Sequence, residues 1–171
     1  MRALKKWPNV PHCHGWLALD ARGDWYMRDE RVQRAGPFPA VKGSRIEHEK
    51  LREFIERNYA ADDLGQWFFQ NGPQRVYVAL EAAPWVWRLG PTDASAGPSI
   101  TSHTGCAARF EAAWLDERGR LFVSTDLGLG LVHTLDMGSA ADAVEAGAWS
   151  PAEVCFDTLP EHFGYRLVPA P

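Results

Sequence analysis

The sequence predicts an α+β fold, namely an antiparallel β-meander with repeated β-hairpin motifs and one main helix packed on the sheet. Three observations predict it. A short Asp-x-x-Gly motif followed by aromatic residues occurs three times in the 171 residues, strand-like runs flank the copies, and one segment has a strong helical pattern. With 46% hydrophobic and 23% charged residues, the chain is typical of a globular protein that can bury a core.

The repeated motif is a hairpin turn that leads into an aromatic strand. Its copies begin at Asp20, Asp62 and Asp116, each with Gly three residues later. An Asp side chain accepts a backbone N–H two residues on, and Gly adopts the left-handed conformation that closes a short loop. The spacing of the copies is irregular, which excludes a solenoid. We therefore assign these three Asp residues to structure and not to catalysis.

Further strands are indicated by short runs of apolar and aromatic residues. These runs cover 16–19, 75–80, 84–89 and 112–115. Because side chains alternate along a strand, Trp85 and Trp87 should share one face. Arg88 should then lie on the opposite face, together with Val86.

The main helix is predicted to start after Ser44. Glu47 follows three residues later, as in a capping box, and apolar residues recur at helical spacing until Tyr59. His48 lies on the apolar side of this pattern, which predicts a packed, hydrogen-bonded core histidine. A shorter helix is predicted over 139–146, ending before Gly147.

Composition predicts a division of the chain at 91–98, a linker rich in Gly and Pro. The N-terminal half, 1–90, holds two hairpin copies and the helix, and the C-terminal half, 99–171, holds the third copy. Charge changes sign at the same place. Residues 1–90 carry 14 Lys and Arg and 11 Asp and Glu, whereas residues 91–171 carry 4 and 11.

Several classes of protein lack their signals in this chain. Neither half has the Lys/Arg stripe that nucleic-acid binding needs, so no nucleic-acid partner is predicted. No run of about 18 apolar residues is present, and no apolar stretch follows the basic start, so no membrane partner and no export signal are predicted. The odd number of thiols (Cys13, Cys106 and Cys155) favours a reducing compartment. The sequence therefore predicts a cytoplasmic protein.

The run Trp67-Phe68-Phe69-Gln70-Asn71-Gly72-Pro73-Gln74-Arg75-Val76-Tyr77-Val78, with Glu81-Ala82-Ala83-Pro84-Trp85 after it, resembles a proteobacterial family of uncharacterised proteins. The order of motifs is also similar to domain-of-unknown-function family 1285. The resemblance implies an α+β fold with repeated structural motifs and a signalling or regulatory role, and it brings no catalytic residues. The chain departs from that pattern in a longer loop over 28–43 and in its C-terminal part.

Two clusters of His and Cys supply ligand types that zinc prefers. The candidate metal residues are His12, Cys13, His14, His103 and Cys106. Each cluster precedes a strand that leads into a hairpin copy. Neither cluster contains a Cys-x-x-Cys pair, and Cys is often a small buried hydrophobe, so a purely structural role is the competing interpretation. The same residues would also provide the thiol and base of a Cys–His enzyme.

Aromatic residues next to arginines form the second candidate site. Its members are Trp67, Tyr77, Trp85, Trp87, Arg75 and Arg88. Most of the rings should be core, but an Arg beside an exposed aromatic ring suits a planar or anionic ligand or a docking protein.

No complete catalytic set is present in the sequence. We therefore predict a non-catalytic ligand-binding or regulatory module, with a small molecule or protein as partner and without a cofactor. The alternative is a small enzyme that uses a metal such as zinc, or a thiol, at the His/Cys clusters. A homodimer through an exposed Trp edge is a third possibility.

Overall fold

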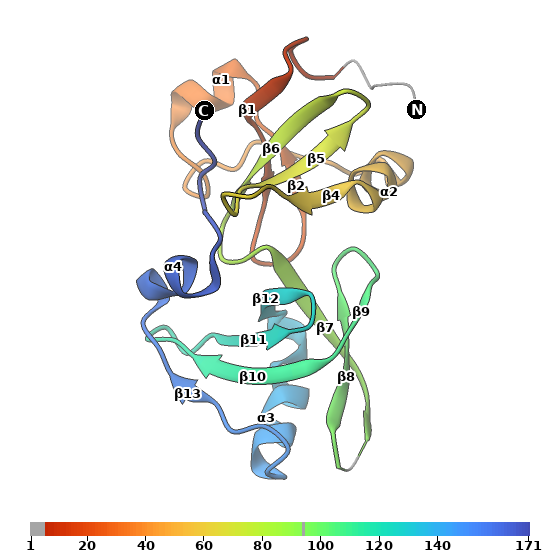
Figure 1. The fold of residues 1–171 in the computed structure, drawn as a ribbon, viewed down its shortest axis with the longest axis vertical. Helices are drawn as coiled ribbons and strands as arrows, with labels where there is room; N and C mark the ends of the chain where they lie inside the picture. The colour runs from red at the N-terminus through yellow and green to blue at the C-terminus, as the bar shows by residue number, and fades with distance from the viewer. Residues whose placement is uncertain (1–5, 94) are drawn as a thin grey trace. The chain divides into compact units, whose positions relative to one another are not determined.

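A computed structural model describes residues 6–93 and 95–171, and they form two compact units, each with its own sheet (Figure 1). Unit 1 contains the described residues up to Asp20, then Asp24–Glu81 and Gly164–Pro171. Unit 2 contains Ala21–Gly23 and Ala82–Phe163. None of the helices in the described residues is long and apolar enough to cross a membrane.

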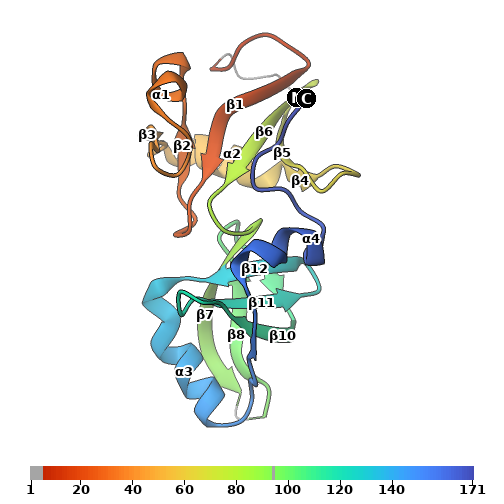
Figure 2. The same cartoon turned by 90° about the vertical axis from the view of Figure 1, so that its left-hand side faces the viewer.

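Unit 1 is a six-stranded sheet with the order β3-β2-β1-β6-β5-β4. Its strands are β1 (His12–Leu19), β2 (Trp25–Met27), β3 (Ser44–Arg45), β4 (Tyr59–Ala61), β5 (Trp67–Asn71) and β6 (Gln74–Leu80). Its helices are α1 (Glu30–Ala35) and α2 (Glu49–Arg57). α2 lies against one face of the sheet (Figure 2). It buries Leu51 and Ile55 there, and the centroid of the Phe54 ring lies 5.4 Å from that of Phe69.

Unit 2 is a seven-stranded sheet with the order β13-β10-β11-β12-β7-β8-β9. Its strands are β7 (Trp85–Asp93), β8 (Gly97–Ser102), β9 (Ala107–Ala108), β10 (Phe110–Leu115), β11 (Leu121–Thr125), β12 (Gly128–Val132) and β13 (Ala152–Glu153). Its helices are α3 (Met137–Glu145), α4 (Leu159–Phe163) and short 3₁₀ turns η1 (Thr134–Asp136) and η2 (Phe156–Thr158). Trp85 and Trp87 lie 6.1 Å apart on one face, as predicted.

The two sheets repeat one topology. When the second sheet is read from β9 to β10, its strands follow the same order as those of the first sheet, with each number raised by six, so that β9 corresponds to β3 and β10 to β4. β13 is an additional strand beside β10. In both sheets the first strand pairs in parallel with the last, β1 with β6 and β7 with β12. The turns at Asp62 and Asp116 are therefore equivalent, since one joins β4 to β5 and the other β10 to β11.

These turns use the Asp side chain as predicted. Oδ1 of Asp62 accepts the N–H groups of Leu64 and Gln66, each at 2.9 Å. Oδ1 of Asp116 accepts the N–H groups two and four residues on, at 3.0 and 2.8 Å. Oδ1 of Asp20 makes the second of these bonds, to the Asp24 N–H at 2.9 Å. All three residues thus have the structural role that the sequence predicts.

Ser102 begins a turn of the same kind, which a search for Asp-x-x-Gly does not find. Its Oγ accepts the N–H groups of Thr104 and Cys106, at 3.3 and 3.0 Å, and its carbonyl accepts the N–H of Gly105. A hydroxyl oxygen replaces the carboxylate here because a turn of this kind needs only one acceptor at its first residue.

The predicted α+β class is confirmed, but a simple antiparallel meander is wrong. The pairs β1–β6, β7–β12 and β10–β13 are parallel, and the strands form two sheets. The segment 91–98, expected to be a linker, instead contains the end of β7, a turn and the start of β8. Gly and Pro in this segment accommodate the end of a hairpin, where a register shift lies between Leu89 and Thr92.

The main helix starts later than predicted. Ser44 pairs with Met27 at the edge of the sheet, so it cannot cap a helix. α2 begins instead at Glu49, where Nδ1 of His48 accepts the N–H of Leu51 at 3.3 Å. His48 is therefore an exposed cap and not a core histidine. The shorter predicted helix is confirmed as α3, with its start two residues earlier.

Substitutions at two equivalent glycines test how the segment that contains Gly164 packs within unit 1. Gly65 and Gly119 have φ of 76° and 75°, and a Cβ on Gly119 would meet open space, whereas one on Gly65 would overlap the carbonyl of Gly164. Gly119→Ala should cost about 1 kcal/mol of unfolding free energy, from backbone strain alone. Gly65→Ala should cost at least about 1 kcal/mol more. Urea denaturation measures both, and equal costs would contradict this packing.

The Asp116 turn should contribute strongly to stability. Its carboxylate is fully buried and also pairs with Arg120 at 2.9 Å. Asp116→Ala leaves two N–H groups and a guanidinium without that partner, so we expect a loss of about 2–4 kcal/mol in denaturant unfolding. Asp63→Ala, at an exposed position of the equivalent turn, is the control and should stay within about 0.5 kcal/mol of wild type. A similar effect of both substitutions would argue against the assigned role.

Candidate functional site

One face of the sheet in unit 1 brings together a cation, two imidazoles and two aromatic rings. We call it the cationic face and define it as His12, His14, Phe68, Arg75 and Tyr77. The register explains the grouping: His12 is paired with Arg75 across β1 and β6, and Phe68 is paired with Tyr77 across β5 and β6. Residues that are paired across neighbouring strands, and residues two apart along one strand, point to the same side of the sheet. This face is opposite the one that α2 covers.

Ring contacts hold the side chains of the cationic face in place. The His14 ring is stacked on Tyr77, with centroids 4.5 Å apart and planes within 7°. The guanidinium of Arg75 lies 4.3 Å from the centroid of the Phe68 ring, and Phe68 meets Tyr77 edge-on at 5.7 Å. Phe68 and Tyr77 are buried beneath these contacts. The charged groups therefore rest on an apolar, ordered base.

The hydroxyl of Tyr77 links this face to the Asp62 turn. It donates to Oδ2 of Asp62 at 3.3 Å, and Gln66 Nε2 donates to the same oxygen at 3.2 Å. Burial alone would raise the pKa of Asp62, but hydrogen bonds from Gln66, Leu64 and Tyr77 outweigh it and lower the pKa. Asp62 thus stays ionised while its oxygens are used within the turn.

Arg75 is half-buried and has no carboxylate partner within residues 6–93 and 95–171. The exposed His12 is its neighbour across the strands. Burial lowers the pKa of His14, and the nearby His12 lowers it further, although a hydrogen bond to the backbone of His12 opposes this. The face is therefore positive through Arg75 at neutral pH, and protonation of histidine would add to it. Such a face suits a carboxylate or phosphate group.

The six predicted ligand residues are divided between the two units. Arg75 and Tyr77 belong to the cationic face, whereas Trp67 contacts Tyr59 at 4.8 Å on the face that α2 covers. Trp85, Trp87 and Arg88 belong to unit 2.

Both tryptophans of this set in unit 2 are core residues. Their indole N–H groups donate to the carbonyls of Leu127 and Val123, at 3.0 and 2.9 Å. Arg88 pairs with Asp136 at 2.7 Å, which raises the pKa of Arg88. These three residues therefore have structural partners already.

The five predicted metal residues are also divided. His12 and His14 share the cationic face, but strand alternation turns Cys13 into the core, where burial raises its pKa to about 11. His103 and Cys106 lie in the Ser102 turn of unit 2, where Nδ1 of His103 accepts the N–H of Val86 at 3.2 Å. Among the residues that the structure describes, no three His, Cys, Asp or Glu are grouped to hold a metal ion.

Phe68 was in neither of the candidate sets predicted from the sequence. The two histidines were predicted to belong to a different site from Arg75 and Tyr77. The alternation of β5 and β6 places Phe68 beside Tyr77, so that signal was available. The parallel pairing of β1 with β6 was not available, because it joins residues more than sixty positions apart.

The two sheets and the cationic face define an α+β protein built from two units of one topology. A family model named DUF2944, with the description "Protein of unknown function (DUF2946)", matches residues 1–170, so the chain belongs to this family. The fold is similar to that of a DUF1285 family protein from Silicibacter pomeroyi DSS-3, with a TM-score of 0.54 and 13% identity, over 82% of this chain and 79% of that chain. This similarity confirms the predicted resemblance at the level of the fold.

A DUF1285 family protein from Shewanella baltica OS155 is also similar, with a TM-score of 0.48 and 14% identity, over 74% of this chain and 91% of that chain. A comparison with curated proteins found no match. The family thus carries no assigned function, and the residues themselves have to suggest one.

The lowered pKa of His14 predicts a specific dependence of stability on pH. An unfolded chain binds a proton at the ordinary histidine pKa of about 6.5, and the folded chain does so only at lower pH. The contribution of neutral His14 to the free energy of unfolding should therefore be fully present above that pKa and should be lost as the pH drops below it. Urea unfolding at about pH 7.5 and about pH 5.5 measures the difference.

In that experiment His14→Phe keeps a ring on Tyr77 but cannot titrate, so it should reduce the loss at low pH. An identical pH response of wild type and His14→Phe would show that His14 does not contribute.

Proposed function

We propose that this protein is a non-catalytic module that binds a small anion on the cationic face of unit 1. The observation that carries the proposal is the state of Arg75, which is half-buried against Phe68 and lacks a carboxylate partner among the described residues. A guanidinium that has lost part of its hydration favours an anionic partner. A ligand carboxylate or phosphate would supply that partner and accept paired hydrogen bonds.

The surroundings of Arg75 support such a role. Its position is fixed by the Phe68 ring, so little conformational entropy is lost when an anion binds. His12 is its exposed neighbour across the strands, at the distance of a paired residue, and adds a donor or a charge. Both groups reach the anion from rigid strands and not from a loop.

The side chains that an enzyme would need are either unreactive or already hydrogen-bonded within the structure. The thiol of Cys13, with its pKa raised to about 11, stays protonated at neutral pH and is a poor nucleophile. The hydroxyl of Tyr77 donates a hydrogen bond to Asp62. A binding role therefore fits these side chains better than a thiol or metal enzyme does, and the resemblance to family 1285 suggests that binding would serve regulation.

Calorimetric titration with inorganic phosphate and with benzoate tests the proposal. At least one of them should bind to wild type, and Arg75→Ala should weaken binding about tenfold to a hundredfold, since a hydrogen bond to a charged group contributes about 1.5–3 kcal/mol. Arg75→Lys should give an intermediate loss because it keeps the charge but not the paired donors.

Arg57→Ala is the matched control for this titration. It removes the same charge from the exposed side of α2 in the same unit and should leave the affinity within about twofold of wild type. If neither anion binds, or if Arg57→Ala weakens binding as much as Arg75→Ala, the proposed site is wrong.

A further inference from the structure

Unit 2 has an apolar cavity of about 320 Å³ between α3 and the strands β10 and β11. Leu115 and Val144 line it from β10 and α3 and are 38% and 39% exposed, so both offer apolar surface to another molecule. Leu121, Met137 and Pro151 complete its apolar part. The cavity has room for one or two aliphatic side chains from another molecule.

A second cavity of about 410 Å³ adjoins the first. Leu115 lines both, and Glu117, Glu153 and Val154 are among the other residues of the second. β13 places Glu153 directly beside Leu115, as its partner in the parallel pair with β10. We call the two cavities together the acidic groove, defined by Leu115, Val144, Glu145 and Glu153.

The charge of the acidic groove is not neutralised locally. Glu145 and Glu153 are exposed and form no ion pair with any Lys or Arg in the described part of the chain. Glu145 also lies in the last turn of α3, where the helix dipole is negative and no basic residue compensates it. A carboxylate at this position stabilises nothing in α3, but it strengthens the attraction for a cation.

The arginines closest in sequence have other partners. Arg120 pairs with Asp116 at 2.9 Å and lies 4.6 Å from the centre of the Phe156 ring. Arg118 lies over the same ring at 5.4 Å. Residues 82–163 carry four Arg and no Lys against 11 Asp and Glu, so unit 2 as a whole has a negative net charge.

We propose that the acidic groove binds a basic peptide segment of a partner protein. An aliphatic side chain of the segment fits beside Leu115 and Val144, and Lys or Arg side chains on either side of it meet Glu145 and Glu153. The apolar contact supplies affinity, and the opposite charges supply specificity and orientation. An anionic lipid or fatty acid suits the groove less well, because its head group would lie next to two unpaired carboxylates.

Fluorescence polarisation with a labelled Lys-Lys-Leu-Leu-Lys-Lys peptide tests the inference. The peptide should bind to wild type, and binding should weaken at about 1 M salt, where charges are screened beyond about 3 Å. Glu-Glu-Leu-Leu-Glu-Glu is the matched probe of opposite charge and should not bind. Equal binding of both peptides, or of neither, would overturn the proposal.

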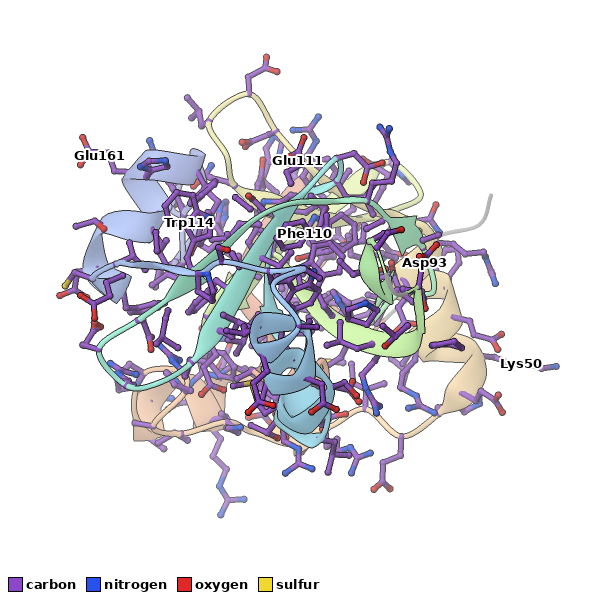
Figure 3. The ribbon with its side chains drawn as sticks, turned by 90° about the horizontal axis from the view of Figure 1, so that it is seen from below. Lys50, Asp93, Phe110, Glu111, Trp114 and Glu161 are labelled. Atoms are coloured by element: carbon purple, nitrogen blue, oxygen red, sulfur yellow. The ribbon has the colours of Figure 1, made fainter. Side chains whose placement is uncertain are left out.

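Variants locate the contact. The double variant Glu145→Lys/Glu153→Lys should bind the basic peptide about tenfold more weakly and should gain affinity for the acidic one. Leu115→Ala should weaken binding about fivefold to tenfold. Glu111→Lys and Glu161→Lys, at exposed positions that line neither cavity, should leave binding unchanged (both residues are labelled in Figure 3).

Two results would indicate that the groove binds something other than a basic peptide. If light scattering shows a dimer that Leu115→Ala dissociates, a second copy of the chain covers the groove. If dodecanoate binds and Glu145→Lys/Glu153→Lys tightens it, the groove accepts an acyl chain. Either result contradicts a basic peptide as the ligand, and circular dichroism of each variant verifies that the fold is kept.

Discussion

The hydrogen bonds from backbone N–H groups to one side-chain oxygen at the start of a turn determine much of this structure. Asp62, Asp116 and Ser102 each provide such an oxygen. A turn closed in this way fixes which residues face each other across the hairpin, and the register decides which side chains enter the core. The turn at Asp62 has a further effect, because its second oxygen accepts the hydroxyl of Tyr77. The cationic face thus depends directly on a turn.

The two units share one topology but differ in the side chains at equivalent positions. The counterpart of Arg75 in unit 2 is Leu129, which is buried, and the counterpart of Tyr77 is Leu131. The counterpart of Val76 is Gly130, where the absence of a side chain makes room for the ring of Trp87. Unit 2 therefore fills with tryptophan the space that unit 1 fills with smaller side chains. The positive charge of unit 1 is a property of its side chains and not of the topology.

Local features were predictable from the sequence, and long-range ones were not. The Asp turns, the shared face of Trp85 and Trp87 and the helix α3 follow from patterns within a few residues. The start of α2 was misjudged because Ser44 has both a capping pattern and a strand partner, and only the fold shows which one prevails. His12 and His14 could not be placed beside Tyr77, because the strands β2 to β5 and the helices α1 and α2 lie between β1 and β6 in the chain.

The path of the chain determines which of the two units can be completed first during synthesis. Unit 2 is nearly continuous, over Ala82–Phe163, whereas unit 1 also requires Gly164–Pro171. The carbonyl of Leu167 accepts the N–H of Leu80, and Arg166 and Ala170 donate to the carbonyl of Gly65 and the side chain of Gln66. These bonds cannot form until all of unit 2, which ends at Phe163, has left the ribosome. The unit that begins first is completed last, and its Asp62 turn lacks these partners throughout the interval.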